Sequence, residues 1–228
     1  MTRLDASLLK PVPPFSRMTT AQIKDVLALA TARLAPAGEY IFDEGAEAAS
    51  FHLLLDGHIQ VERLNAEGDR VISLHIPPGQ LFGIAKALGR TTYPASAVAA
   101  VDCVVLSWPM SQWSEFADRY DGFATETYSV IGARMAEMHN RIMELATQRV
   151  EQRIACALLR LSEKHGRQVE GGTEIAFPIT RKVLSEMTGS TLHTVSRLLS
   201  AWERDEIVKS KRKHIFVLDP SRLEQLAQ

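Results

Sequence analysis

The chain is poor in the residues that build covalent or metal-held frameworks. Only two cysteines occur among its 228 residues, Cys103 and Cys156, and each stands alone in an apolar stretch. No CxxC pair and no Cys/His cluster is present in the sequence, which therefore supports neither a disulfide framework nor a structural zinc site. Both cysteines are expected to pack as small, largely buried side chains.

Long apolar runs are missing as well. No stretch approaches the roughly 20 apolar residues of a membrane-spanning helix. The first residues, MTRLDASLLKPVPPF, lack the apolar core of a secretory signal. The sequence thus predicts a cytoplasmic protein with no membrane partner. It also lacks a P-loop, a GxSxG elbow, an HExxH motif and the His-x-His pair of metal-binding cupins, so we do not expect an enzyme.

Charge is nearly balanced overall but unevenly distributed. The chain has 26 Lys and Arg against 27 Asp and Glu, a formal net charge of −1. From Val150 onward there are 13 basic against 10 acidic residues, which leaves 13 against 17 in the part before it. A mildly basic C-terminal part on an acidic N-terminal part fits a DNA-binding domain attached to a sensor, although charge alone says little.

Residues 180–202 carry the most informative pattern. Two short helices are predicted around Gly189, which permits the tight or left-handed backbone that such a turn usually needs, and Thr180 and Thr191 are expected to cap them. The second helix has two faces. The apolar face holds Val195, Leu198, Leu199 and Trp202, and the polar face holds His193, Ser196, Arg197 and Ser200. Such a helix suits the DNA major groove, where an arginine reads guanine, whereas a plain surface hairpin is the alternative.

A basic hairpin follows these helices. Glu206–Lys209 and His214–Leu218 read as short strands around the turn Ser210–Lys213. A hairpin of this charge directly after two such helices predicts a wing that touches the phosphate backbone. Taken by itself, the basic run could also be a plain solvated turn.

The stretch TRKVLSEMTGSTLHTVSRLLSAWERDEIV, residues 180–208, resembles the C-terminal signature of the CRP/FNR family of bacterial transcription regulators. The positions that carry the resemblance are Thr180, Gly189, Thr194, Val195, Ser196, Arg197 and Leu198. The resemblance implies an inverted-repeat double-stranded DNA site of the TTG…CAA type and RNA polymerase as a partner. Many members have an acidic residue at the position of His193, and some have an arginine at that of Leu192. The implied DNA contacts are Thr180, Arg181, Ser190, Thr191, His193, Thr194, Ser196, Arg197, Ser200, Lys211, Arg212 and Lys213.

The N-terminal part changes character after a predicted helix, Thr19–Thr31. Short strand-like runs alternate with turn glycines about every ten residues, which indicates an antiparallel roll or sandwich. The runs are Tyr40–Phe42, Phe51–Leu55, His58–Leu64, Val71–Ile76, Ala95–Ala100 and Cys103–Trp108. The motifs Gly38-x6-Gly45, Leu55-Asp56-Gly57 and Pro78-Gly79-Gln80-Leu81-Phe82-Gly83 are similar to the cyclic-nucleotide-binding β-roll of the same family.

The implied effector pocket departs from that roll at the residues that would hold a cyclic nucleotide. Where such members have a ribose-binding glutamate this chain has Ile84, and their phosphate-binding Arg-Ser pair aligns with Ala95-Ser96. Because a phosphate needs an arginine or a cluster of N–H donors, we do not expect cyclic AMP. No cysteine precedes Cys103, so an iron–sulfur cluster is not expected either. The remaining pocket, Phe82, Gly83, Ile84, Ala95 and Ser96, is apolar or binds nothing.

The stretch FGIAKALGRTTYPASAVAAV, residues 82–101, is similar to the nitric-oxide-responsive branch of the family, which controls denitrification genes. This resemblance implies sensing through haem, for which His52, His58, His75 and His139 are the candidate iron ligands. Each of them is more often a surface or structural histidine, and no spacing singles one out. The alternative is a family member that binds DNA without a ligand and is controlled by its expression level.

A long helix is predicted to connect the two parts, from about Ser114 to Arg149. Tyr128, Ile131, Met135, Met138, Ile142 and Leu145 follow a heptad spacing that buries itself best against a second identical helix. The predicted class is therefore α+β: a β-roll over residues 1–112, a dimerisation helix over 113–148 and a winged helix-turn-helix over 149–228. In such a dimer, an effector in the roll would act by tilting the long helix.

Overall fold

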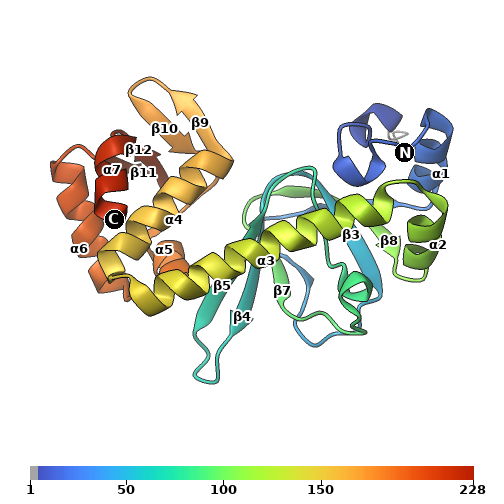
Figure 1. The fold of residues 1–228 in the computed structure, drawn as a ribbon, viewed down its shortest axis with the longest axis horizontal. Coiled ribbons are helices and arrows are strands. Elements are labelled where there is room, and N and C mark those ends of the chain that lie inside the picture. Colours follow the sequence, from blue (N-terminus) through green and yellow to red (C-terminus); the bar gives the residue numbers. More distant parts are fainter. Residues whose placement is uncertain (1–4) are drawn as a thin grey trace. The chain divides into compact units, whose positions relative to one another are not determined.

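A computed structural model describes residues 5–228 (Figure 1). They form two compact units, the first comprising residues 5–63 and 74–137 and the second comprising Leu64–Ser73 and Met138–Gln228. The division falls inside the long helix α3 (Phe123–Thr147) and within the hairpin of β4 (Ile59–Leu64) and β5 (Arg70–Ile76). The tip of this hairpin therefore belongs with the C-terminal unit. The domain boundaries at 112/113 and 148/149 stay a prediction.

Two four-stranded antiparallel sheets build the first unit. One has the order β1-β8-β3-β6, with β1 at Thr31–Ala35, β8 at Cys103–Pro109, β3 at Ser50–Asp56 and β6 at Leu81–Phe82. The other has the order β2-β7-β4-β5, with β2 at Tyr40–Phe42 and β7 at Ser96–Ala99. Apolar side chains from both sheets, including those of Leu54, Ile59 and Val105, form a buried cluster between them. The predicted β-roll is thereby confirmed.

Helices cover one side of this roll. The indole N–H of Trp108 donates to the Val26 carbonyl over 2.8 Å, which ties β8 to α1 (Thr20–Ala28). Phe51 packs edge-on against Trp113 of α2 (Gln112–Arg119). Single 3-10 turns lie at Ala6–Leu8, Pro13–Phe15 and Ala85–Leu88. The helix predicted over Thr19–Thr31 ends earlier, because β1 begins at Thr31 and pairs with β8.

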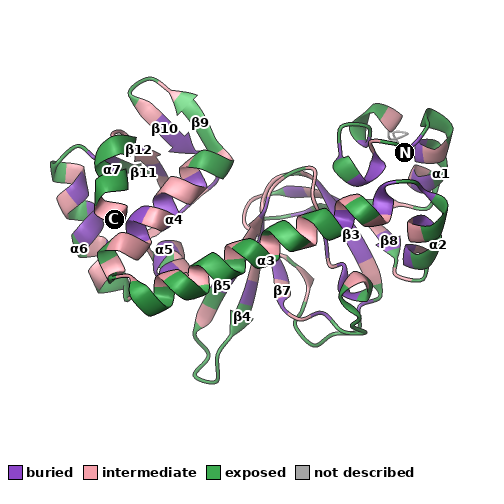
Figure 2. Ribbon diagram, viewed as in Figure 1, coloured by how far each residue is buried: buried purple, intermediate pink, exposed green. Residues whose placement is uncertain are grey.

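The predicted connecting helix is two helices. Helix α2 ends at Arg119, and α3 begins at Phe123 after Gly122, whose φ of +82° a side chain would disfavour. Buried Tyr120 and Phe123 anchor this break in the core. Helix α3 has 25 residues and so spans about 37 Å. Figure 2 shows that much of its surface is exposed.

The second unit contains the predicted pair of helices, α5 (Arg181–Thr188) and α6 (Leu192–Arg204). They pack with α4 (Val150–His165) around a core that includes Leu158, Val195 and Trp202. A four-stranded antiparallel sheet has the order β11-β12-β10-β9. Its strands are β9 (Gly166–Val169), β10 (Gly172–Ile175), β11 (Val208–Lys211) and β12 (His214–Val217), and α7 (Pro220–Ala227) follows. The winged helix-turn-helix prediction is confirmed, whereas β9, β10 and α7 were not predicted.

None of the helices within residues 5–228 is both long and apolar enough to cross a membrane.

Candidate nucleic-acid interface

Threonine caps fix the start of both helices of the helix-turn-helix. The Thr180 hydroxyl accepts a hydrogen bond from the Val183 N–H, and the Thr191 hydroxyl accepts one from the Thr194 N–H, each over 3.1 Å. Gly189 between the helices has a φ of +59°, and its N–H bonds back to the Ser185 carbonyl. The two threonine caps and the turn at Gly189 were predicted from the residue types at these positions.

Helix α6 separates its two faces as predicted. Val195, Leu198, Leu199 and Trp202 are buried. His193, Arg197 and Ser200 are exposed, and Ser196 is half-buried. No hydrogen bond or ion pair within residues 5–228 holds the Arg197 guanidinium, so all of its donors are available to a base edge.

Arg181 is engaged differently. Its guanidinium lies 3.0 Å from a Glu203 carboxylate oxygen and 3.2 Å from the Ser200 hydroxyl, and it also donates to the Ser196 carbonyl. These three partners all lie on α6. Arg181 therefore braces α6 against α5, an arrangement that the sequence pattern did not reveal.

The wing is a tighter hairpin than predicted. Strands β11 and β12 pair up to Lys211 and His214, so Ser210 and Lys211 are strand residues and only Arg212 and Lys213 form the turn. Both have positive φ, 50° and 72°, as a type I′ turn requires. The Ile179 N–H donates to the Lys213 carbonyl over 2.7 Å, which fixes the turn beside the start of α5. Three exposed basic side chains, Lys211, Arg212 and Lys213, meet at the turn.

The residues predicted to contact DNA thus gather on connected elements of one unit. Thr180 and Arg181 begin α5, Ser190 and Thr191 form the turn, and the wing lies beside them through Ile179. The remaining members, His193, Thr194, Ser196, Arg197 and Ser200, lie on the first three turns of α6. The exposed side chain of Leu192 lies among them, at the position where some family members have an arginine.

The interior of the roll is filled with aromatic rings at the predicted effector pocket. Phe42 stacks on Tyr93 with 3.8 Å between ring centroids and on His52 with 5.5 Å. His52 also lies 5.1 Å from Phe82. A Cβ on Gly83 would come within 2.9 Å of both the His52 and the Phe42 rings, so this glycine permits the close packing.

The other predicted pocket residues have different surroundings. The Ser96 hydroxyl accepts a hydrogen bond from the Glu44 N–H over 2.8 Å, and Ala95 is buried. Ile84 faces a separate cavity of about 340 Å³ within the first unit. This cavity is lined mostly by proline and aliphatic residues, namely Pro11, Val12, Pro13, Pro14, Pro78, Gly79, Gln80, Leu81, Thr127 and Val130. Of the five predicted pocket residues, Ile84 is the one that lines this cavity.

Among the candidate haem ligands, His52 has the most distinctive surroundings. Its Nδ1 lies 2.7 Å from the Ser107 hydroxyl, and its buried Nε2 has no hydrogen-bond partner in the described chain. Burial first, and repulsion by Arg33 second, lower the pKa of His52 to about 3. The imidazole is therefore neutral at pH 7, as iron ligation requires. However, the Phe42 and Phe82 rings lie against it, so the space beside the imidazole that a haem would need is occupied.

The other histidines fit a haem less well. His58 and His75 are half-buried, and His139 is exposed on α3. No histidine lines the 340 Å³ cavity or the cavity of about 220 Å³ in the second unit. In the described part of the chain, no group of three or more His, Cys, Asp or Glu residues could hold a metal ion.

Cys103 is buried, which raises the pKa of its thiol.

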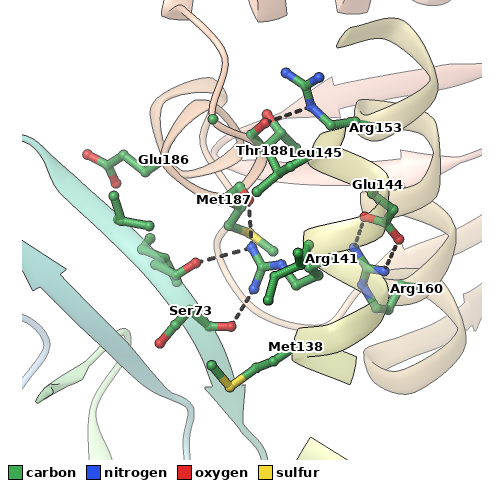
Figure 3. A pocket seen from close by; sticks show the side chains of 14 residues that line it. Ser73, Met138, Arg141, Glu144, Leu145, Arg153, Arg160, Glu186, Met187 and Thr188 are labelled. Carbon is green, nitrogen blue, oxygen red and sulfur yellow. Dashed lines mark hydrogen bonds and ion pairs between the residues drawn. The ribbon is translucent and has the colours of Figure 1, made fainter. Parts of the chain in front are cut away.

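A second feature that the sequence pattern missed joins the β4–β5 hairpin to α5. Arg141 of α3 donates to the carbonyls of Ile72 and Ser73 on the hairpin and to that of Met187 on α5 (Figure 3). Arg70 of the hairpin forms an ion pair with Glu186 at 3.3 Å. These contacts surround the 220 Å³ cavity, whose wall includes Met138, Ile142 and Leu145. All of these residues belong to the second unit.

Comparisons with known proteins agree with this arrangement. Residues 32–120 match the cyclic nucleotide-binding domain, and residues 152–226 match the Crp-like helix-turn-helix domain. The chain is 26% identical over 220 residues to the cyclic AMP receptor protein of Thermus thermophilus, covering 96% of this chain and 98% of that protein. It is 24% identical over 190 residues to the fumarate and nitrate reduction regulatory protein of Yersinia pestis, covering 83% and 76%. The structure of FixK2 from Bradyrhizobium japonicum superposes with a TM-score of 0.77 at 24% identity, covering 87% and 98%.

The fold combines a β-roll, a long helix and a winged helix-turn-helix. Its helix α6 exposes Arg197, which has no hydrogen-bond or ion-pair partner within residues 5–228. These features define a DNA-binding transcription regulator. The chain belongs to the CRP/FNR family. The members of this family are regulators of transcription and not enzymes, as the sequence predicted.

Proposed function

We propose that the protein is a homodimer that binds an inverted-repeat DNA site of the TTG…CAA type and regulates transcription by RNA polymerase. This proposal rests on Arg197, which is exposed on the polar face of α6. Its guanidinium has no hydrogen-bond or ion-pair partner within residues 5–228. Its guanidinium can donate to O6 and N7 of one guanine per half-site. Because its partner is the chromosome, we place the protein in the cytoplasm.

The exposed seam of α3 supports the dimer. Met135 is 64% exposed, Ile142 60% and Leu145 56%, and Tyr128 and Met138 are exposed as well. Ile131 is the exception, because it packs partly against the core of the first unit. Apolar side chains at heptad spacing are stabilised by a second copy of the same helix. A two-fold axis along α3 would then present two copies of α6 about 34 Å apart, one turn of DNA.

The effector belongs to the same proposal. The roll has Ala95 where cyclic-nucleotide-binding members have an arginine, and Ile84 where they have a glutamate. We therefore propose an effector other than cyclic AMP. Nitric oxide bound through haem, with His52 as the iron ligand, is the first candidate, since His52 Nε2 is buried without a partner. The alternative is a regulator without a ligand, and the tight Phe42–Tyr93 stack beside Gly83 favours that reading.

The test is DNA binding followed by fluorescence anisotropy on a TTG…CAA duplex and on a scrambled duplex. Each titration is run with bare protein and with reduced haem and nitric oxide, and the haem absorption spectrum is recorded. Salt-sensitive binding to the specific duplex supports the regulator proposal. Dependence on haem and nitric oxide, lost in His52→Gln, supports the effector. Equal binding by the bare protein supports the ligand-free alternative, and equal binding to both duplexes refutes the proposed site.

Dimerisation is tested separately by sedimentation. Ile142→Glu places a charge in the exposed seam of α3, so we expect monomers where the unaltered protein forms dimers. Asn140→Glu adds the same charge to the same helix outside the heptad seam, and it should leave the dimer intact. Dimers of equal strength in both variants would remove the seam from the interface.

A further inference from the structure

The sheet of the second unit contains one acidic residue, Glu174. It is the single carboxylate in β9 to β12, strands that the structure describes completely, and it is 9% exposed. One of its oxygens lies 2.6 Å from the Arg167 guanidinium, and the other lies 3.2 Å from Nδ1 of His214. The carboxylate therefore connects β9 to His214, the first residue of the wing strand β12.

The contacts of His214 assign its tautomer. Its Nδ1 faces the Glu174 carboxylate and also lies 3.4 Å from the Ile175 carbonyl oxygen. Because both of these groups only accept hydrogen bonds, Nδ1 carries a hydrogen, and in the neutral ring Nε2 holds the lone pair. Within residues 5–228, Nε2 has no hydrogen-bond partner. It is the atom at which the ring gains its second proton.

His214 lies among the cations of the wing. Its register partner across the hairpin is Lys211, and paired residues of an antiparallel sheet place their side chains on the same face. The next residue, Ile215, is buried in the core, so this face is the one turned away from the core. Lys211 is exposed, and so is Lys213, which precedes His214 in the chain. His214 is thus adjacent to two lysines for which we expect phosphate contacts.

The charged groups around the ring come from four segments. Glu174 faces it from β10, with Arg167 of β9 on the other carboxylate oxygen. Lys211 faces it from β11, and Lys213 lies in the turn. DNA phosphates that contact the two lysines would add negative charge beside the ring. A negative charge at this distance favours the protonated form of a histidine.

We propose that His214 binds the DNA backbone in its protonated form, donating from Nε2 to a phosphate oxygen, so that DNA affinity rises as the pH falls from 8 to 6. Histidine is the side chain that ordinarily changes charge in this range. Each half-site then takes up a proton when DNA binds, and linkage makes the affinity depend on pH. This inference rests on the proposed function and adds to it a backbone contact that responds to pH.

The experiment measures binding of the full-length protein to a TTG…CAA duplex and to a scrambled duplex by fluorescence anisotropy. Titrations are run at pH 8 and at pH 6, each at several salt concentrations. His214→Gln cannot be charged, and His214→Lys is charged at both pH values. His193→Gln is the matched control, because His193 is the other histidine of the candidate interface and is exposed on α6. In addition, ¹⁵N NMR identifies which nitrogens of His214 carry hydrogen with and without DNA.

The unaltered protein should bind both duplexes about fivefold more tightly per half-site at pH 6 than at pH 8, the factor for one added charge about 4 Å from a phosphate in water. Its salt slope should also be steeper at pH 6 by about one unit per half-site. His193→Gln should keep both effects. His214→Gln should lose both, and His214→Lys should show the steeper slope at both pH values. At pH 6, the DNA complex should have hydrogen on both nitrogens of His214.

Two results would overturn the assignment while the regulator proposal stands. One is an unchanged pH dependence in His214→Gln, and the other is an Nε2 of His214 without hydrogen in the DNA complex at pH 6. Equal binding to the two duplexes refutes the proposed inverted-repeat site alone, because both duplexes present the same backbone and the pH comparison still decides the assignment. If neither duplex binds at either pH, the proposed function fails and the assignment fails with it.

Discussion

A guanidinium nitrogen of Arg141 lies 2.6 Å from the carbonyl oxygen of Met187, the penultimate residue of α5. The same side chain donates to two carbonyls of β5, at Ile72 and Ser73 (Figure 3). One cation thus satisfies carbonyls on two elements that are far apart in the sequence. It fixes the end of the first helix of the helix-turn-helix against the hairpin tip.

Replacing Arg141 should loosen these attachments. We expect Arg141→Met to lower the free energy of unfolding by about 2 kcal/mol, the scale of a lost hydrogen bond to a charged group. Hydrogen exchange should become faster in residues 64–73 and at the end of α5. Arg204→Met is the control, since within residues 5–228 that exposed arginine makes one hydrogen bond, a 3.4 Å bond to the Ser200 carbonyl. Similar exchange in both variants would contradict the role given to Arg141.

Arg181 is expected to position α6 rather than to neutralise a phosphate. Arg181→Met removes the ion pair with Glu203 and the bonds to Ser200 and Ser196. Specific binding should weaken, while the slope of log affinity against log salt should stay the same, because no phosphate contact is lost. A slope lower by about one unit would show instead that Arg181 contacts the backbone.

Arg197→Ala should cost about 1–3 kcal/mol of binding free energy on the specific duplex and relax the preference for guanine at one position. The folded protein should be unaffected, because the side chain is exposed and uncommitted. Titrations with each of the four base pairs at that position measure both effects. An equal loss on specific and random DNA would refute the base contact.

Lys211→Ala should weaken binding to all sequences alike and lower the salt slope by about one unit. Lys211 is an exposed strand residue next to the wing turn. From there we expect its charge to contact DNA phosphates and not base edges. Anisotropy at several salt concentrations, on specific and random duplexes, checks this. A loss confined to the specific duplex would point to a base contact.

His52 should make the first unit sensitive to acid. The pKa of His52 is about 3 in the folded protein against 6.5 when unfolded, so protonation favours the unfolded chain. The stabilisation is complete above pH 6.5 and is lost progressively as the pH falls toward 3. Between pH 7 and pH 5 the loss amounts to about 2 kcal/mol, and over this window it depends only on the unfolded pKa.

His52→Phe tests this acid sensitivity. Phenylalanine can take the place of the imidazole among the Phe42 and Phe82 rings and cannot be protonated. Denaturant unfolding of the variant should show a weaker dependence on pH between 7 and 5 than the unaltered protein. Parallel curves for the two proteins would mean that His52 is not the group responsible.

Patterns in the sequence were sufficient to predict the helices and strands whose residues repeat with a clear period, and the residues that cap helices. The Thr180 and Thr191 caps, the stripe from Val195 to Trp202 and the strand β2 are where the sequence predicts them. The predictions failed where long-range pairing decides. Strand β1 was not predicted, because it depends on hydrogen-bond partners that β8 supplies from about 70 residues further along the chain.

The tertiary contacts of the arginine side chains could not be predicted either, because they too depend on elements that are far apart in the sequence. Helical spacing placed Arg197 on a polar face, but nothing in the sequence distinguishes the contacts of Arg141 and Arg181 from those of other surface arginines. Their roles differ because tertiary packing brings carbonyls to Arg141 and a carboxylate to Arg181, and leaves Arg197 unoccupied. Spacing along a helix predicts which side chains share a face, but it does not predict which groups will arrive from another element.

The wing turn has a consequence for how this chain can change. Arg212 and Lys213 both hold a left-handed backbone, which costs an ordinary residue about 1 kcal/mol and costs asparagine or glycine much less. The chain places two cations where Asn-Gly would fold more easily. A more stable hairpin would therefore carry less positive charge toward DNA, so thermostability and affinity oppose each other at these two positions.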